Sequence, residues 1–211
     1  DALKEWRAAA VGFERTGAWG ARGFVGFAAW NFALVLLASL AVVMVAPSAA
    51  GSGIPEVKAY LNGVKVPRFL SLDTLVVKVL GTACAVGSGL AVGPEGPLVH
   101  VGAIIGSGLT RGAKSVRCGG ARRDALRWPR LRRFASDVDR RDFISVGAAA
   151  GVAAAFGAPV GGILFSLEEA SSFWTPALLW RALAATTTAT FTLLLVGNAI
   201  AGDREGLGNM G

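Results

Sequence analysis

A single glutamate stands between glycines and prolines in residues 93–100, within sequence that is otherwise apolar enough for a membrane. Placing an ionisable residue at that depth costs free energy, so such a residue usually marks a functional site. Similar Gly/Pro breaks occur at residues 51–56 and 157–162, and each one begins a new apolar segment. Interrupted helices of this kind place helix N-termini near an ion in the middle of a bilayer. The three breaks therefore predict a membrane protein that transports an ion.

Composition supports a membrane protein and argues against a nucleic-acid-binding one. Hydrophobic residues make up 53% of the 211 residues and charged residues 17%, whereas soluble domains carry about 25% charged residues. The net charge of +7 is concentrated in residues 111–141, which hold eleven Lys and Arg residues and three Asp. A basic loop between apolar segments is typical of the cytosolic side of a membrane protein. We therefore expect lipid, and not nucleic acid, to surround the chain.

Apolar periodicity predicts an all-α, multi-pass membrane protein. Segments 24–47, 75–92 and 176–200 are long enough to cross a bilayer as helices. Shorter helices are expected at 52–61, 96–109, 143–156 and 159–169. Lys78 lies near the start of the second long segment, where its side chain could extend to the interface. Two GxxxG pairs, Gly102 with Gly106 and Gly147 with Gly151, predict close helix packing.

The domain organisation follows from these segments. Residues 1–21 are predicted to form a loop or interfacial segment, residues 22–201 the membrane domain with its basic cytosolic loop at 111–141, and residues 202–211 a polar tail. Cys84 and Cys118 are too few for a disulfide framework, and no His/Cys cluster suggests a metal site or a cofactor.

The helix starts predict an anion site. Unpaired N–H groups and a partial positive charge at a helix N-terminus bind anions, and glycines let the ion approach the backbone. Glu95 is itself an anion at such a position, so it should compete with a permeating anion, and its protonation would free the site. The candidate anion-binding residues are Ser52, Gly53, Ile54, Pro55, Gly93, Glu95 and Gly96.

Several of these residues have simpler interpretations. Ser52 could be only a helix N-cap, and His100 is more typical of a hydrogen-bonded packing residue than of a proton relay. Glu168 and Glu169 are adjacent on a helix, so at most one of them faces the interior. A membrane-embedded serine hydrolase using Ser52 or Ser88 with His100 is an alternative of a different class, although neither serine has the Gly-x-Ser-Gly context.

The three motifs, in their order and spacing, resemble the CLC family of chloride channels and anion/proton exchangers, most closely its plant and algal branch. The matching stretches are Gly51–Pro55, Glu95–Pro97 and residues 157–169. The resemblance implies a CLC-type bundle of full and half-length helices, in which Ser52 contacts a chloride ion and Glu95 is the gating glutamate. It also implies that Glu169 transfers protons, which favours chloride/proton antiport. A passive voltage-gated chloride channel remains the alternative.

The resemblance carries further expectations about assembly and location. It implies a homodimer, with the helices from Pro159 to about Val196 at the interface, in an intracellular membrane of a eukaryote, vacuolar or vesicular. It covers about the first half of the family's inverted-repeat membrane domain, so this piece alone is not expected to form a complete pore. A non-conducting partner subunit is therefore a further alternative. Pro94 departs from the family pattern, because Lys or Arg is usual there.

Overall fold

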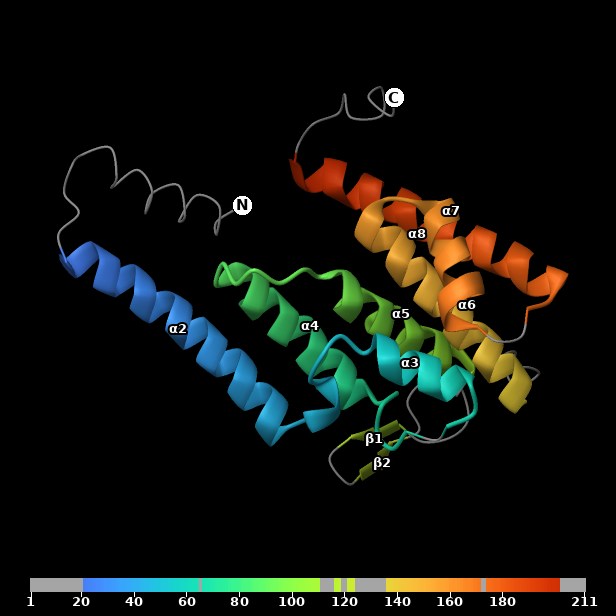
Figure 1. Ribbon diagram of the computed structural model, residues 1–211, viewed down its shortest axis with the longest axis horizontal. Coiled ribbons are helices and arrows are strands. Elements are labelled where there is room, and N and C mark those ends of the chain that lie inside the picture. Colours follow the sequence, from blue (N-terminus) through green and yellow to red (C-terminus); the bar gives the residue numbers. More distant parts are fainter. Residues whose placement is uncertain are drawn as a thin grey trace.

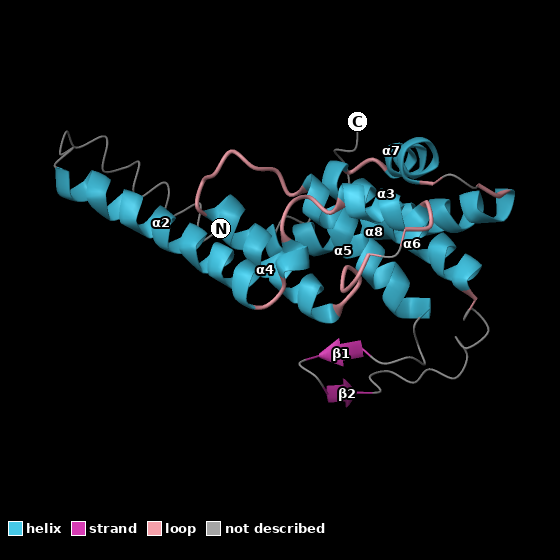
Figure 2. Ribbon diagram, turned by 60° about the horizontal axis from the view of Figure 1, so that its bottom comes forward, coloured by secondary structure: helices cyan, strands magenta, loops and turns pink. Residues whose placement is uncertain are grey.

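The computed structural model describes residues 21–64, 66–110, 116–118, 121–123, 136–171 and 174–201. Nearly all of the expected N-terminal segment 1–21, the polar tail 202–211 and much of the basic loop lie outside these ranges. The helices are α2 (Ala21–Met44), α3 (Ile54–Leu61), α4 (Leu72–Gly87), α5 (Glu95–Thr110), α6 (Asp137–Phe156), α7 (Pro159–Phe165) and α8 (Pro176–Ala201) (Figure 1). A short antiparallel hairpin, β1 (Val116–Cys118) and β2 (Ala121–Arg123), lies outside the helices (Figure 2).

Local capping signals explain where the helices begin and end. Ser71 caps α4 by accepting a hydrogen bond from the Thr74 amide at 3.2 Å, and Ser136 caps α6 in the same way through the Asp139 amide at 3.1 Å. Gly157, with φ of +64°, ends α6 in the left-handed conformation that glycine adopts most readily. The two serines bond backbone amides that have no partner within the helix, so the helices begin there. Gly157 turns the chain out of the helical conformation, so α6 ends there.

The second expected span is shorter than predicted. Residues 75–92 were expected to be helical throughout, but α4 ends at Gly87 after 16 residues. At about 1.5 Å per residue this length falls short of a bilayer core of about 30 Å. The chain leaves the helix where Ser88 caps its end and Gly89 takes a φ of +77°. The expectation of a full span here is therefore wrong, and residues 88–94 form a connection that leads to α5.

Two other boundaries also differ from expectation. The segment assigned to the basic loop, 111–141, overlaps α6, because Ser136 starts that helix at Asp137. The expected helix 159–169 is divided into α7 and a π-helical turn at Ser166–Ala170. In contrast, α5 begins and ends within one residue of the expected 96–109.

Glycines bring α5 and α6 into backbone contact. A Cβ built at Gly102 would collide with the carbonyl oxygen of Gly147, and one at Gly106 would collide with the Phe143 carbonyl oxygen. Similarly, a Cβ at Gly151 would strike the Leu98 carbonyl. The two GxxxG pairs therefore face each other across the α5–α6 contact, and the close helix packing that the sequence predicted for them is confirmed. The same helix α6 packs against α7 and α8 on its other sides (Figure 1).

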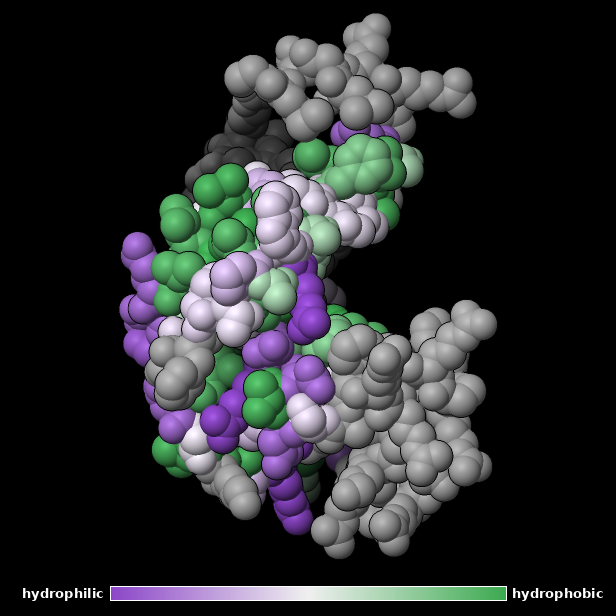
Figure 3. Space-filling view, turned by 90° about the vertical axis from the view of Figure 1, so that its right-hand side faces the viewer, coloured by the Kyte–Doolittle hydropathy of each residue, from purple (hydrophilic) through white to green (hydrophobic). Residues whose placement is uncertain are grey.

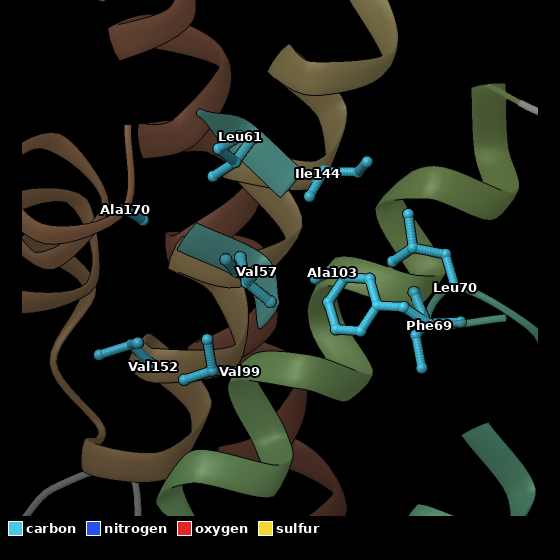
Figure 4. Close-up of a cluster of buried hydrophobic side chains, with 11 residues drawn as sticks. Val57, Leu61, Phe69, Leu70, Val99, Ala103, Ile144, Val152 and Ala170 are labelled. Atoms are coloured by element: carbon cyan, nitrogen blue, oxygen red, sulfur yellow. The ribbon is translucent and has the colours of Figure 1, made fainter. Parts of the chain in front are cut away.

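The main core lies where α3, α5 and α6 meet (Figure 4). Its side chains come from these helices, from the connection before α4 and, in the case of Ala170, from the π-helical turn after α7, and all of them are buried. They are Val57, Leu61, Phe69, Leu70, Val99, Ala103, Ile104, Ile144, Ala148, Val152 and Ala170. A smaller cluster of Ala46, Ala49 and Val77 joins α4 to the end of α2. Both clusters border the loop at residues 50–53, so the core positions that loop.

Much of the molecular surface is apolar. Large hydrophobic side chains such as Phe32 on α2, Leu80 on α4 and Trp180 on α8 are exposed. Figure 3 shows green, hydrophobic side chains at the surface of one end of the molecule, beside hydrophilic ones in purple. Among the described residues, the segment Pro176–Ala199 is long and apolar enough to cross a membrane alone, and Ala28–Met44 forms a shorter apolar stretch. An apolar surface of this extent is typical of contact with lipid or with further protein.

Candidate functional site

The loop before α3 has a backbone that requires glycine. Gly51 has a φ of +73° and Gly53 a φ of +88°, and Ser52 lies between them. Gly53, not Ser52, occupies the N-cap position of α3, and no side chain of the described residues caps that helix. Within the same ranges, the Ser52 Oγ accepts only a long hydrogen bond, 3.4 Å, from the Ile54 amide. Ser52 is therefore exposed at the helix start with its hydroxyl largely free to bind something else.

Glu95 is the first residue of α5, and its carboxylate folds back over Gly93, two residues earlier. A Cβ built at Gly93 would overlap the Glu95 carboxylate, with its Cδ 2.7 Å away. Only a glycine at residue 93 leaves room for this arrangement. The negative charge thus lies beside the first turn of a 16-residue helix, where N–H groups have no intrahelical partner. This is the position at which the sequence predicted competition between a carboxylate and an anion.

The first two Gly/Pro breaks meet in space. A Cβ built at Gly96 would lie 2.7 Å from the Cβ of Ser52 and 3.3 Å from its Cα. The Ser52 loop therefore packs directly on the first turn of α5, and the starts of α3 and α5 adjoin. This contact assembles the predicted residues Ser52, Gly53, Ile54, Pro55, Gly93, Glu95 and Gly96 around the two helix starts.

The third break is arranged differently. Gly157 ends α6 and Pro159 begins the short helix α7. Among the described residues, a Cβ built at Gly157 would meet nothing within 4 Å, whereas one at Gly53, Gly93 or Gly96 would collide with His100, Glu95 or Ser52, respectively. The crowded part of the site is thus formed by the first two breaks.

His100 is a buried packing residue beneath the Ser52 loop. Its side chain is fully buried, its Nε2 lies 3.1 Å from the carbonyl oxygen of Phe69, and its ring stacks on the Phe69 ring with centroids 4.4 Å apart. A Cβ built at Gly53 would strike this ring. The His100 Nδ1 has no hydrogen-bond partner among the residues that the structure describes, and the hydroxyl of Ser88 donates to the Ala85 carbonyl. The hydrolase alternative requires a hydrogen bond between His100 and Ser52 or Ser88, and the described residues show neither bond.

Lys78 lies at the site although the sequence analysis placed it near the interface. Its side chain is only 3% exposed, and its Nζ donates hydrogen bonds to the carbonyl oxygens of Ala49 at 3.0 Å and Gly51 at 2.8 Å. The expectation of an extended, interfacial lysine is wrong because α4 starts three residues earlier than predicted and the loop folds over it. An ionisable residue inside an apolar helix was the signal that could have identified it.

Glu169 lies on the π-helical turn after α7, on a different element from Glu95. Its Oε1 is 2.5 Å from the Nζ of Lys58 on α3, and both side chains are partly exposed. Glu168 is also exposed, so the described chain buries neither carboxylate. Lys58 was not selected from the sequence, because nothing in the α3 pattern indicates a partner 111 positions away on the π-helical turn.

Comparisons with known proteins agree on one family. The model of the voltage-gated chloride channel family matches residues 34–206. The chain is 54% identical over 161 residues to the putative chloride channel-like protein CLC-g of Arabidopsis thaliana, covering 76% of this chain and 20% of that protein. It is 50% identical over 190 residues to the H(+)/Cl(−) exchange transporter 7 of Bos taurus, covering 88% of this chain and 23% of that protein.

Solved structures agree with the sequence matches. The crystal structure of a eukaryotic CLC transporter superposes with a TM-score of 0.71 at 29% identity, over 90% of this chain and 33% of that one. A slow cyanobacterial Cl−/H+ antiporter gives a TM-score of 0.72 at 25% identity, over 92% of this chain and 40% of that one. The chain spans about a fifth of the length of the curated relatives it matches. By its sequence motifs, its helical fold and these matches, the chain belongs to the voltage-gated chloride channel (CLC) family of membrane proteins.

Proposed function

We propose that this chain forms part of the transport path of a chloride/proton exchanger, with chloride bound between the starts of α3 and α5 and Glu95 as the gate. The observation that carries the proposal is the contact of Ser52 with Gly96, beside a Glu95 carboxylate folded over Gly93. Hydroxyl and amide donors at this junction suit a monovalent anion. Since these donors are neutral, they favour the weak binding that rapid transport needs.

The gating role of Glu95 rests on charge and position. A carboxylate at a helix start uses the same donors as a permeating anion, so only one of them can occupy the position at a time. Protonation removes the charge of Glu95 and therefore weakens the attraction between its side chain and the donors at the helix start. A position that alternates between carboxylate and chloride couples proton movement to chloride movement.

The choice of exchange over passive conduction rests on Glu169. The chain carries a carboxylate at the place where the family resemblance assigns proton transfer, and its relatives include a protein named an H(+)/Cl(−) exchange transporter. Other relatives are named chloride channels, for example CLC-c of Arabidopsis thaliana. A passive voltage-gated chloride channel is therefore the second candidate, and proton movement distinguishes the two.

The test uses a complete subunit that carries this segment, reconstituted in sealed vesicles. A chloride gradient is imposed without a pH gradient, and the internal pH is recorded together with chloride flux. Exchange predicts uphill proton movement that is lost in Glu169→Gln while chloride flux survives. Chloride flux without proton movement in the wild type would refute exchange and support the channel.

Glu168→Gln is the matched control for Glu169→Gln. Both glutamates lie on the same π-helical turn and both are exposed, but the ion pair with Lys58 involves Glu169. Proton coupling should survive in Glu168→Gln. An equal loss in both variants would mean that the turn, and not the Glu169 carboxylate, is required. Absence of chloride flux in the wild type would point to Pro94 or to a non-conducting partner subunit.

Membership of this family excludes the hydrolase alternative, because the family comprises channels and transporters. We also propose a homodimer in an intracellular membrane, vacuolar or vesicular. The exposed apolar side chains of α8, such as Trp180 and Phe191, support an interface or lipid contact there. Cross-linking of cysteines placed at these two positions tests the dimer, and a fluorescent fusion of the complete protein tests the location.

A further inference from the structure

A cluster of three buried or half-buried serines joins the middle of α6 to the π-helical turn that carries Glu169. Ser145 on α6 is 2% exposed, and its Oγ lies 2.8 Å from the Oγ of Ser166 and 2.5 Å from that of Ser171. These two partners are 21 and 26 positions away along the chain. A serine or threonine within a helix can bond a carbonyl of its own helix, as Thr190 does on α8. Ser145 instead uses its hydroxyl to connect two elements.

The three hydroxyl hydrogens fit one arrangement. The Ser166 hydroxyl donates to the Ser145 carbonyl oxygen at 3.1 Å, which uses its single hydrogen. A hydrogen between the two Oγ atoms of Ser145 and Ser166 must then come from Ser145, and one between Ser145 and Ser171 must come from Ser171. Each hydroxyl of the serine cluster therefore donates once, and the Ser145 Oγ accepts from one end of the turn while it donates to the other.

The contacts of Ser145 span the whole turn. The Ser171 amide donates to the Ser166 carbonyl at 2.9 Å, which is the i to i+5 bond of a π-helix. Single π-helical turns are rare and occur frequently at functional sites. Because Ser145 bonds the hydroxyls of the same two residues, one side chain of α6 holds both ends of the turn. Glu168 and Glu169 lie between these ends, on a segment that is fixed at its first residue and just after its last.

The direction of the Glu169 side chain depends on the shape of this turn. Its carboxylate pairs with Lys58 on α3, and the turn packs against both α3 and α6. Since both side chains of the pair are partly exposed, the pair alone holds the carboxylate weakly. An α-helical turn closes one residue earlier than a π-helical one, so a change from one to the other would rotate Glu169 about the axis and away from Lys58. The Ser145 hydroxyl opposes that change by bonding both ends of the turn.

We propose that Ser145 is a positioning residue for proton transfer: by holding both ends of the π-helical turn, its hydroxyl fixes the direction of the Glu169 carboxylate. This inference rests on the proposed chloride/proton exchange, in which Glu169 passes protons. It adds a residue that lies outside the three sequence motifs, on a helix that supplies none of the candidate anion-binding residues.

The experiment records proton movement and chloride flux in sealed vesicles that contain the complete subunit, and compares the ratio of the two between variants. Ser145→Ala removes the bridging hydroxyl. Ser107→Ala is the matched control, because it removes the hydroxyl of another fully buried serine, which accepts from Arg140 on α6 and lies on α5. Ser171→Ala releases only one end of the turn, at a half-buried side chain. Thermal unfolding of each variant shows that it is folded.

We expect Ser145→Ala to lower proton movement per chloride ion about fivefold, the factor by which the loss of one ordinary hydrogen bond shifts a two-state equilibrium. Ser171→Ala should lower the ratio by less, and Ser107→Ala should leave it unchanged. A wild-type ratio in folded Ser145→Ala, or an equal fall in Ser107→Ala, would overturn the proposal. If Ser145→Ala does not fold, Ser171→Ala decides the question, and a wild-type ratio in that variant refutes the role.

A double variant separates positioning from general support of the fold. In the Glu169→Gln background no proton-carrying carboxylate is left to position, so adding Ser145→Ala should leave the remaining chloride flux unchanged. A further fall in chloride flux would mean that Ser145 acts on the fold as a whole and not through Glu169, and would also overturn the proposal.

The failures of the two proposals are distinguishable. A wild-type subunit that couples protons to chloride, with a ratio that does not depend on Ser145, disproves only the role of the serine. A wild-type subunit that moves chloride without protons disproves the proposed exchange, and the role of Ser145 with it.

Discussion

Substitution of Gly102 by alanine tests the backbone contact between α5 and α6. The added methyl group would collide with the carbonyl oxygen of Gly147 and lie 3.0 Å from the carbonyl carbon of that residue and 3.2 Å from the Gly151 nitrogen. All three atoms belong to helix backbone, so none can rotate away. The helices must instead separate or shift along each other.

The cost can be worked from this geometry. Relief of the collision requires a separation of about 1 Å, and a gap of that size forfeits about a quarter to a half of the dispersion energy of the facing atoms. Overpacking of a well-packed contact typically costs about 1–3 kcal/mol. Since only backbone can yield, we expect Gly102→Ala to destabilise the protein by about 3 kcal/mol, at the upper end of this range.

Gly108→Ala is the matched control on the same helix. A Cβ built at Gly108 meets no atom of the described part of the chain within 4 Å, and replacing a helical glycine by alanine gains up to about 1 kcal/mol of helix propensity. Thermal unfolding of both variants of the complete subunit in detergent provides the comparison. If Gly102→Ala proves as stable as Gly108→Ala, the close approach of α5 and α6 is not what holds them together.

Three further predictions concern the site and its surroundings. Gly53→Ala should destabilise the protein by about 2 kcal/mol or more and weaken chloride binding, because a φ of +88° is strained for alanine and the methyl group meets the His100 ring. A wild-type unfolding temperature together with a wild-type chloride affinity would contradict this. Lys58→Met should change the free energy of unfolding by less than about 1 kcal/mol, since both members of its pair with Glu169 are partly exposed. A larger loss of unfolding free energy, measured with denaturant, would mean that the pair is shielded from solvent. Ser145→Ala should lower the free energy of unfolding by about 1–2 kcal/mol, because the buried Ser145 hydroxyl bonds the hydroxyls of Ser166 and Ser171 at 2.8 and 2.5 Å. An unchanged unfolding temperature would show that these two hydroxyls find other hydrogen-bond partners.

The parts that the sequence predicted well depend on neighbouring residues. The bounds of α5, the close helix packing at the GxxxG pairs and the packing role of His100 follow from patterns within a few turns of helix. The order and spacing of the three motifs carried the family resemblance, and that resemblance added the helical fold. These features are local, so residue spacing and capping chemistry suffice to predict them.

The parts that were missed depend on contacts between distant segments. Whether Lys78 extends to an interface or is buried is decided by a loop 27 residues earlier, and the partner of Lys58 lies 111 positions away. Periodicity carries no information on such contacts. The early end of α4 is different in kind, because Ser88 and Gly89 are visible in the sequence but lie within a run whose apolar character suggests that the helix continues.

The glycine contact between α5 and α6 also limits how the proposed gate at Glu95 can work. Glu95 lies at the start of α5, and that helix meets α6 with backbone against backbone at Gly102, Gly106 and Gly151, beside the buried side chains of the core. Where backbone meets backbone at the glycines, no side chain can yield, so a tilt or slide of α5 would carry α6 with it. Opening at Glu95 is then left to torsion about its own χ angles. Such rotamer changes occur in picoseconds to nanoseconds, whereas collective helix motions take microseconds or longer.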